Sequence, residues 1–173
     1  RKRLYASAVL IITLVAIWCL VGIGKFAAVR DFNATYGRYL GRSVSTDAAL
    51  EDWLFGTETR LLAGRRVLHP TMSRLENDFI MDRFCVTRGG QFHRLFSATF
   101  LHAGIIHLIC NVGFLFTMAP LETGARGPYL VTYFLAGIGG CWAFWKYGSG
   151  GRALGASGSL CGFLGYEVVS ALR

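Results

Sequence analysis

Residues 95–121 read LFSATFLHAGIIHLICNVGFLFTMAPL and contain no Asp, Glu, Lys or Arg. A helix of about 20 apolar residues is long enough to cross the hydrocarbon core of a bilayer. Three further apolar segments, residues 6–24, 128–145 and 153–172, have similar lengths, and Glu167 interrupts the last of them. Only helices and closed barrels span lipid, and these segments are too long and continuous for barrel strands. We therefore predict an all-α membrane protein with a transmembrane helix in each segment.

The composition of the chain favours the same class. Of the 173 residues, 53% are hydrophobic and 16% are charged, whereas a typical soluble domain has about 25% charged residues. These values exclude a disordered or collagen-like chain and disfavour an ordinary soluble domain. The net charge is +8, but the basic residues are dispersed apart from a run at residues 1–3, so we predict no nucleic-acid partner. The five cysteines form no CxxC pair, which disfavours a disulfide framework or a zinc cluster.

Residues 6–24 form the first apolar segment, and the long polar region of residues 25–92 follows it. A basic start before an apolar run is also typical of a secretory signal peptide. The run is long for a signal peptide and no clear A-x-A cleavage site follows it, which favours a transmembrane helix. Residues 25–92 hold most of the acidic residues, so we expect a first loop that lies in water or at the membrane interface.

The second apolar segment carries polar side chains, which are costly inside a membrane and are therefore candidates for function. His107 and Asn111 are one helical turn apart and share a helix face, whereas His102 lies about 140° from His107 on an ideal helix. A histidine pair that binds metal usually has the i, i+4 spacing of HExxH, so a metal site is disfavoured. Hydrogen bonding between helices is the alternative role for these side chains.

The fourth apolar segment begins with Gly155-Ala156-Ser157-Gly158. Backbone N–H groups at a helix start lack helical partners and can stabilise an anion, and glycine allows a close approach of backbone. A serine in this setting fits a nucleophile beside an oxyanion hole. The alternative is helix packing, because Gly158 and Gly162 form a small-xxx-small pattern.

Taken together, HAGIIHLICN at residues 102–111 and GASG at residues 155–158 resemble the rhomboid family of intramembrane serine proteases. The resemblance covers about residues 91–166. It implies a rhomboid-like helical bundle in which four of the six core transmembrane helices are present, with residues 25–92 as the long first loop. His93-Arg94 stands where the family often carries Trp-Arg.

The resemblance implies a role for each motif residue. Ser157 is implied to be the nucleophile, and His107 and Asn111 are implied to donate hydrogen bonds to the oxyanion beside the Ser157 backbone N–H. Four further residues are implied to support the site: His102, Arg94, Gly155 and Gly158. The resemblance implies that Arg94 does so by fixing the first loop. A Ser–His dyad needs no cofactor or metal, so none is expected.

The sequence departs from the family pattern in two places. Cys161 stands where many rhomboids carry an aromatic residue that packs on the catalytic His. The base of the family is a His on its sixth helix, whereas the last His of this sequence is His107. We therefore expect that the chain is truncated at its C-terminus, that the base lies beyond its end, and that residues 1–173 alone are inactive.

The resemblance thus implies an intramembrane serine endopeptidase that cleaves transmembrane segments of membrane proteins. We expect a multi-pass integral membrane protein whose partners are transmembrane protein substrates and the lipid bilayer. The alternative is an inactive rhomboid-like protein that binds membrane proteins for trafficking or degradation. Such relatives commonly lose the nucleophile or place Pro before it, whereas Ala156 precedes Ser157 here. A transporter or structural bundle would leave His107, Asn111 and Ser157 without a role.

Overall fold

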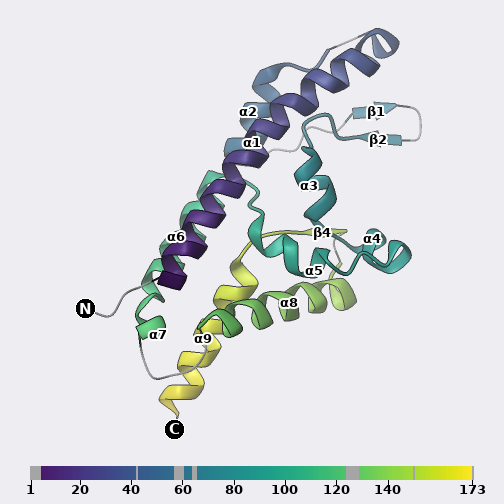
Figure 1. The fold of residues 1–173 in the computed structure, drawn as a ribbon. Coiled ribbons are helices and arrows are strands. Elements are labelled where there is room, and N and C mark those ends of the chain that lie inside the picture. The colour runs from purple at the N-terminus through teal and green to yellow at the C-terminus, as the bar shows by residue number, and fades with distance from the viewer. Residues whose placement is uncertain are drawn as a thin grey trace.

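The computed structural model describes residues 5–41, 43–56, 61–63, 66–123, 129–149 and 151–172, and most of them are helical (Figure 1). This confirms the predicted all-α class. In chain order the elements are α1 (Tyr5–Leu40), α2 (Thr46–Phe55), β1 (Leu61–Ala63), β2 (Arg66–Leu68), α3 (Arg74–Phe79), β3 (Met81–Asp82), α4 (Arg83–Gly89), α5 (Arg94–Ser97), the 3-10 helix η1 (Ala98–Phe100), α6 (Ile105–Thr117), α7 (Pro120–Thr123), α8 (Tyr129–Tyr147), β4 (Arg152–Ala153) and α9 (Ser157–Ala171).

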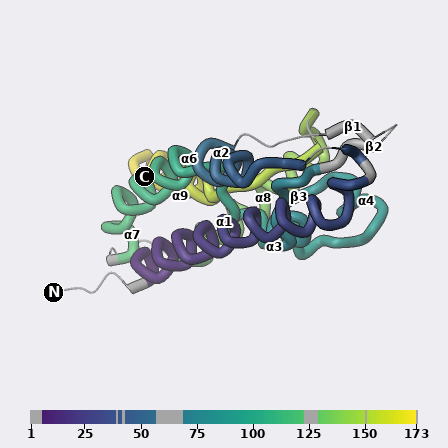
Figure 2. The backbone as a smooth tube through the Cα atoms, turned by 90° about the horizontal axis from the view of Figure 1, so that it is seen from above, coloured from purple at the N-terminus to yellow at the C-terminus, as the bar shows by residue number. Residues whose placement is uncertain are grey.

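Two helical stretches among the described residues, Ala6–Arg38 and Ile105–Glu122, are long and apolar enough to cross a membrane. The start of α1 and the end of α9 lie at one end of the molecule, and the β1–β2 hairpin lies at the other (Figures 1 and 2).

The largest apolar cluster joins the helices that carry the sequence motifs. Its buried side chains come from α1, α6, α8 and α9 and include Leu14, Trp18, Leu108, Leu115, Tyr129, Tyr133, Leu160 and Phe163. The rings of Tyr129 and Phe163 stack with their centroids 4.6 Å apart, an arrangement that aromatic pairs favour. This packing holds α6 and α9 in one body.

The first helix is longer than the segment predicted for it. The predicted transmembrane helix covers residues 6–24, whereas α1 continues to Leu40. α2 and the residues just before it pack back against α1. Asn33 accepts from the backbone N–H of Val44 and donates to its carbonyl, both at 2.8 Å. Trp18 and Trp53 stack with centroids 4.6 Å apart. The apolar run marks the part of the helix that suits lipid, and tertiary contacts extend the helix beyond it.

Residues 25–92, expected as a polar loop, contain several short elements between α1 and α5. They include α2, α3, α4, the β1–β2 hairpin and strand β3. β1 pairs with β2 antiparallel, and β3 pairs antiparallel with β4, far along the chain. The region is therefore folded against the helical body where it is described.

The second apolar segment also differs from one continuous helix over residues 95–121. It begins as α5 and η1, continues through an extended stretch, and becomes regular in α6 at Ile105. Gly104 precedes α6 with φ −175° and ψ 178°. A Cβ added at Gly104 would lie 2.8 Å from the carbonyl oxygen of Leu54, so the close approach of α2 requires glycine at this position.

The third and fourth segments are close to their predicted ranges of 128–145 and 153–172. The predicted start at Pro128 lies outside the described residues, and α8 covers Tyr129–Tyr147. The fourth segment starts with the end of β4 and becomes helical at Ser157.

Candidate active site

One face of α6 carries the two polar side chains predicted to share it. Asn111 is 5% exposed and His107 is half-buried, while Ile106 before them and Ile109 and Cys110 between them are exposed. The Nδ2 of Asn111 is buried and has no hydrogen-bond partner among the described residues. A buried, unpaired amide is costly, and such a donor is available to a ligand atom.

His102 lies in the extended stretch before α6 and not on the helix. It is 3% exposed, and its ring centroid is 5.2 Å from that of His107 with an angle of 62° between the rings. The five-residue spacing therefore brings the two imidazoles edge to face, because the helix starts between them. Neither ring nitrogen of His102 has a hydrogen-bond partner of normal geometry within the described parts of the chain.

Gly155 brings the fourth segment against this histidine pair. Its φ is +117°, which L side chains rarely adopt, and an added Cβ would lie 2.6 Å from Cε1 and 2.9 Å from Nε2 of His107. Its N–H donates to the carbonyl of Ala98 at 2.9 Å. Both the backbone conformation and the ring of His107 therefore require glycine at this position.

Ser157 follows Gly155 by two residues and is the first residue of α9. The Ser157 side chain is exposed, whereas Ala156 before it is fully buried. N–H groups in a first helical turn have no helical partner and carry the positive end of the helix dipole. The N-cap residue of this helix, Ala156, makes no side-chain hydrogen bond to its first turn. The hydroxyl thus lies beside backbone donors, at the edge of a cavity of about 200 Å³ that Gly140, Leu154 and Gly158 also line.

The small residues of α9 pack against α8, as the alternative interpretation of the motif predicts. A Cβ added at Gly162 would lie 2.2 Å from the Cβ of Ala136, so glycine is needed there for helix packing. A Cβ added at Gly158 would lie 3.7 Å from the Cα of Gly140, an ordinary contact. Packing therefore depends on Gly162 more than on Gly158.

Arg94 contacts the region between α3 and β3. Its buried guanidinium donates to the carbonyls of Asn77 at 2.6 Å and Ile80 at 2.9 Å, and its Nε donates to Gln91 Oε1 at 2.6 Å. His93, in place of the family Trp, lies with its Nε2 3.2 Å from the carbonyl of Asp78. These contacts place both residues beside the first loop and not beside Ser157.

Contacts that the sequence did not predict join the first loop to the approach to Ser157. Asp82 pairs with Arg152 in the β3–β4 ladder, and Arg83 donates from its backbone to Gly151 at 2.9 Å and from its guanidinium to the Gly148 carbonyl. No local pattern in the sequence connects these residues, which are about 70 positions apart.

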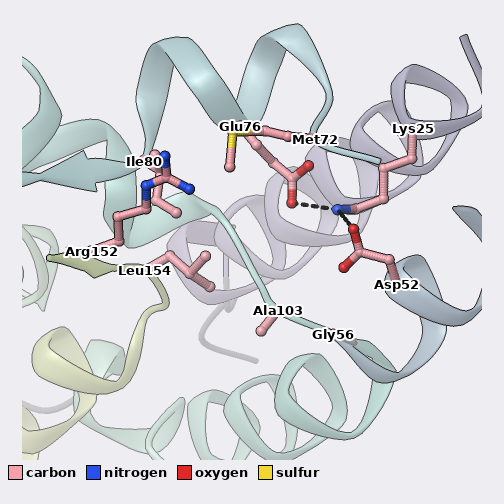
Figure 3. Close-up of a pocket in the computed structure, with 9 residues that line it drawn as sticks. All are labelled: Lys25, Asp52, Gly56, Met72, Glu76, Ile80, Ala103, Arg152 and Leu154. Atoms are coloured by element: carbon pink, nitrogen blue, oxygen red, sulfur yellow. Dashed lines mark hydrogen bonds and ion pairs between the residues drawn. The ribbon is translucent and has the colours of Figure 1, made fainter. Parts of the chain in front are cut away.

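A buried charge cluster lies next to the candidate site (Figure 3). The ammonium of Lys25 on α1 is 2.9 Å from Asp52 Oδ2 on α2 and 2.7 Å from Glu76 Oε1 on α3. The cluster forms one side of a cavity of about 170 Å³, which Ala103 and Leu154 also line. Ala103 follows His102 and Leu154 precedes Gly155, so the cavity adjoins the residues of the candidate site.

The described residues contain no group of three or more His, Cys, Asp or Glu side chains that could hold a metal ion. The polar groups described at the candidate site are Ser157, His102, His107, Asn111 and the backbone N–H groups at the start of α9. Such a set can stabilise an oxyanion at a carbonyl carbon that the serine attacks.

Comparison with protein-family models gives a match for the second half of the chain. Residues 89–173 match the family model described as Rhomboid domain. The matched range includes all the candidate residues, from Arg94 to Gly158. Neither the curated proteins nor the solved structures give a match to the chain.

Proposed function

Because the Rhomboid domain of residues 89–173 makes the chain a member of the rhomboid family, we propose that the protein is an intramembrane serine endopeptidase. It cleaves transmembrane segments of membrane proteins and spans the bilayer several times. The observation that carries the proposal is the contact of the His107 ring with Gly155, two residues before a serine that begins a helix. Helix packing alone requires neither an exposed serine hydroxyl nor the buried, unpaired amide of Asn111 on α6.

In the proposed reaction, Ser157 Oγ attacks the carbonyl carbon of the scissile peptide bond. The carbonyl oxygen becomes an oxyanion, which accepts hydrogen bonds from Asn111 Nδ2, the His107 ring and the backbone N–H of Ser157. Donors of this kind act best where water is excluded and where they are already oriented. The helical packing of α6 against the body of the protein provides that orientation.

The nucleophile also needs a base, because a serine hydroxyl is a weak nucleophile near neutral pH. The family supplies a His that follows the nucleophile in the chain, and residues 1–173 contain no His after His107. We propose that a His outside residues 1–173 acts as this base. It takes the proton of Ser157 during attack and gives it to the leaving amine, and water then hydrolyses the acyl-enzyme by the same path.

The test is covalent labelling of the full-length protein in detergent or bilayers with a fluorophosphonate probe. We expect labelling at Ser157, with no labelling of Ser157→Ala. Ser159→Ala is the matched control, because Ser159 is fully buried two residues further along α9, and it should label as the wild type does. Labelling of Ser157→Ala, or a folded wild-type protein that never labels, would contradict the proposal. The second result would favour the inactive, substrate-binding alternative.

A further inference from the structure

From the contacts of strand β3 we infer that Asp82 is a positioning residue for Ser157. Its carboxylate holds Arg152, and the pair fixes the strand that leads into Gly155 and the nucleophile. The inference rests on the proposed function, because it takes Ser157 as the reacting group. It concerns a residue of the first loop that lies outside the sequence motifs.

The two oxygens of Asp82 have separate partners. Oδ2 accepts from Arg152 Nε at 3.1 Å. Oδ1 accepts from the backbone N–H groups of Phe84 at 2.9 Å and Cys85 at 3.1 Å, so it caps the start of α4. The carboxylate is thereby fixed in direction by α4 and can hold the guanidinium of Arg152 in one place. A carboxylate that was exposed to water and lacked these two backbone hydrogen bonds could rotate, and it would not hold the guanidinium in one place.

The pair is part of a backbone ladder. β3 and β4 are antiparallel, with Met81 opposite Ala153 and Asp82 opposite Arg152. Met81 is fully buried and packs in a small apolar cluster with Leu95, Ala98 and Ala153. The ladder is short, since each strand has two residues. An isolated ladder of this length is only marginally stable. The Asp82–Arg152 ion pair therefore contributes more to keeping the two strands in register than it would in a larger sheet.

Downstream of the ladder, the chain has little room to take up a shift. Gly155 N–H donates to the Ala98 carbonyl at 2.9 Å, and Ser157 begins α9 two residues later. The segment from Arg152 to Ser157 is therefore held by Asp82 at one end and by Ala98 near the other. Figure 3 shows Arg152 and Leu154 on the side of the cavity opposite Lys25. Displacements of about 1 Å in a catalytic group can cost roughly 10² in rate.

Asp82→Asn separates the two roles of this carboxylate. Asn is as good a helix N-cap as Asp, so α4 keeps its cap, while Arg152 loses the charge that holds it. We expect the rate of fluorophosphonate labelling of Ser157 in the full-length protein to fall roughly tenfold, with kcat for a transmembrane substrate reduced and KM unchanged. Hydrogen exchange of the backbone amides of residues 153–157 should become faster, while exchange in α1 stays the same.

A double-mutant cycle gives the decisive comparison. If Asp82 and Arg152 act as one unit, the effects of Asp82→Asn and Arg152→Gln on the labelling rate should be less than additive in the double variant. Arg152→Lys should recover part of the rate. Arg88→Gln, which removes an exposed arginine from α4, is the control and should behave as the wild type.

The outcomes separate this inference from the proposed function. A wild-type protein that does not label would end the proposed function, and the hydrogen-exchange comparison would still decide the inference. Equal exchange of residues 153–157 in the wild type and Asp82→Asn would overturn the positioning role. Additive effects in the cycle, or faster exchange throughout the helices, would also overturn it, since Asp82 would then act independently of Arg152 or on the whole fold.

Discussion

Replacing Gly155 with alanine tests the geometry of the candidate site most directly. The residue has φ +117°, outside the conformations that L side chains ordinarily adopt. Holding alanine in a sparsely populated backbone region costs about 1–3 kcal/mol. In addition, the new Cβ would lie 2.6 Å from Cε1 of His107, whereas ordinary contact begins at 3.4 Å. The ring or the backbone must therefore move by roughly 0.8 Å, the difference between these two distances.

The expected result is a moderate loss of stability together with a larger loss of activity. If the His107 ring moves away, the site loses one of the proposed oxyanion donors, and such a loss costs about 10²–10³ in kcat. If the backbone moves, Ser157 moves with it, and the labelling rate falls as well. Both routes lower the activity, because the contact joins His107, the proposed donor, to the segment that carries Ser157, the proposed nucleophile.

The assay compares the labelling rate of Ser157, kcat and the midpoint of thermal unfolding for the wild type, Gly155→Ala and Gly151→Ala. Gly151 lies in the same connection between α8 and α9, but a Cβ added there meets nothing within 4 Å. Gly151→Ala should therefore match the wild type in all three measurements. Wild-type labelling and turnover in a folded Gly155→Ala protein would refute the claim that Gly155 and His107 form one site.

Three further predictions concern the Lys25 cluster, the polar side chains of α6 and the carboxylate of Asp82. Lys25→Met leaves two buried carboxylates without their cation, and loss of one partner from such a cluster costs about 3–5 kcal/mol. Chemical denaturation should show this loss, and Arg30→Met, at an exposed pair on the same helix, should show little change. His107→Ala and Asn111→Ala should each lower kcat about 10²–10³-fold without unfolding the protein; unchanged turnover in both would leave them as packing residues. Partial burial acts to raise the pKa of Asp82, but hydrogen bonds from two backbone N–H groups and the charge of its arginine partner outweigh it and hold the pKa below its usual value. A depressed folded-state pKa stabilises the protein above the unfolded-state pKa of about 3.9 and loses that effect as the pH falls through the folded value. The stability difference between the wild type and Asp82→Asn should therefore shrink below about pH 4, and a difference that grows there would contradict this assignment.

The all-α class and the rhomboid family could be predicted from the sequence because both depend on short stretches of neighbouring residues. A membrane span needs a continuous apolar run, and residues 95–121 provide one regardless of what packs around them. The family motifs are likewise short stretches whose spacing is visible in the sequence. The helical structure and the Rhomboid domain match confirm these two predictions.

Element boundaries were less predictable, because hydropathy reports the solvent around a segment and not its backbone conformation. Residues 25–40 contain many polar side chains, yet they continue α1, where Lys25 pairs with Asp52 of α2 and Asn33 bonds to Val44 just before α2. Lys25 finds Asp52 at a separation of 27 residues and Glu76 on a third helix. Nothing in a local window of sequence indicates that this lysine is buried.

The position of His102 shows how a single backbone feature changes a site. On an ideal helix it would lie about 140° from His107. Because Gly104 is extended, the helix does not continue back to His102, and the ring centroids of His102 and His107 lie 5.2 Å apart. Gly104 itself was visible in the sequence, but the contact with Leu54 that requires glycine was not, since it comes from another helix.

The glycines of the fourth segment show that the two interpretations of its motif describe different residues. Gly162 is needed for packing, because an added Cβ would overlap Ala136, whereas Gly155 is needed for the approach of His107. A motif that served packing alone would place its critical glycines along the α8–α9 contact. Gly155 lies before α9, has a backbone conformation suited to glycine, and contacts a histidine from α6. Helix packing therefore accounts for Gly162, whereas the close approach of the His107 ring accounts for the glycine at position 155.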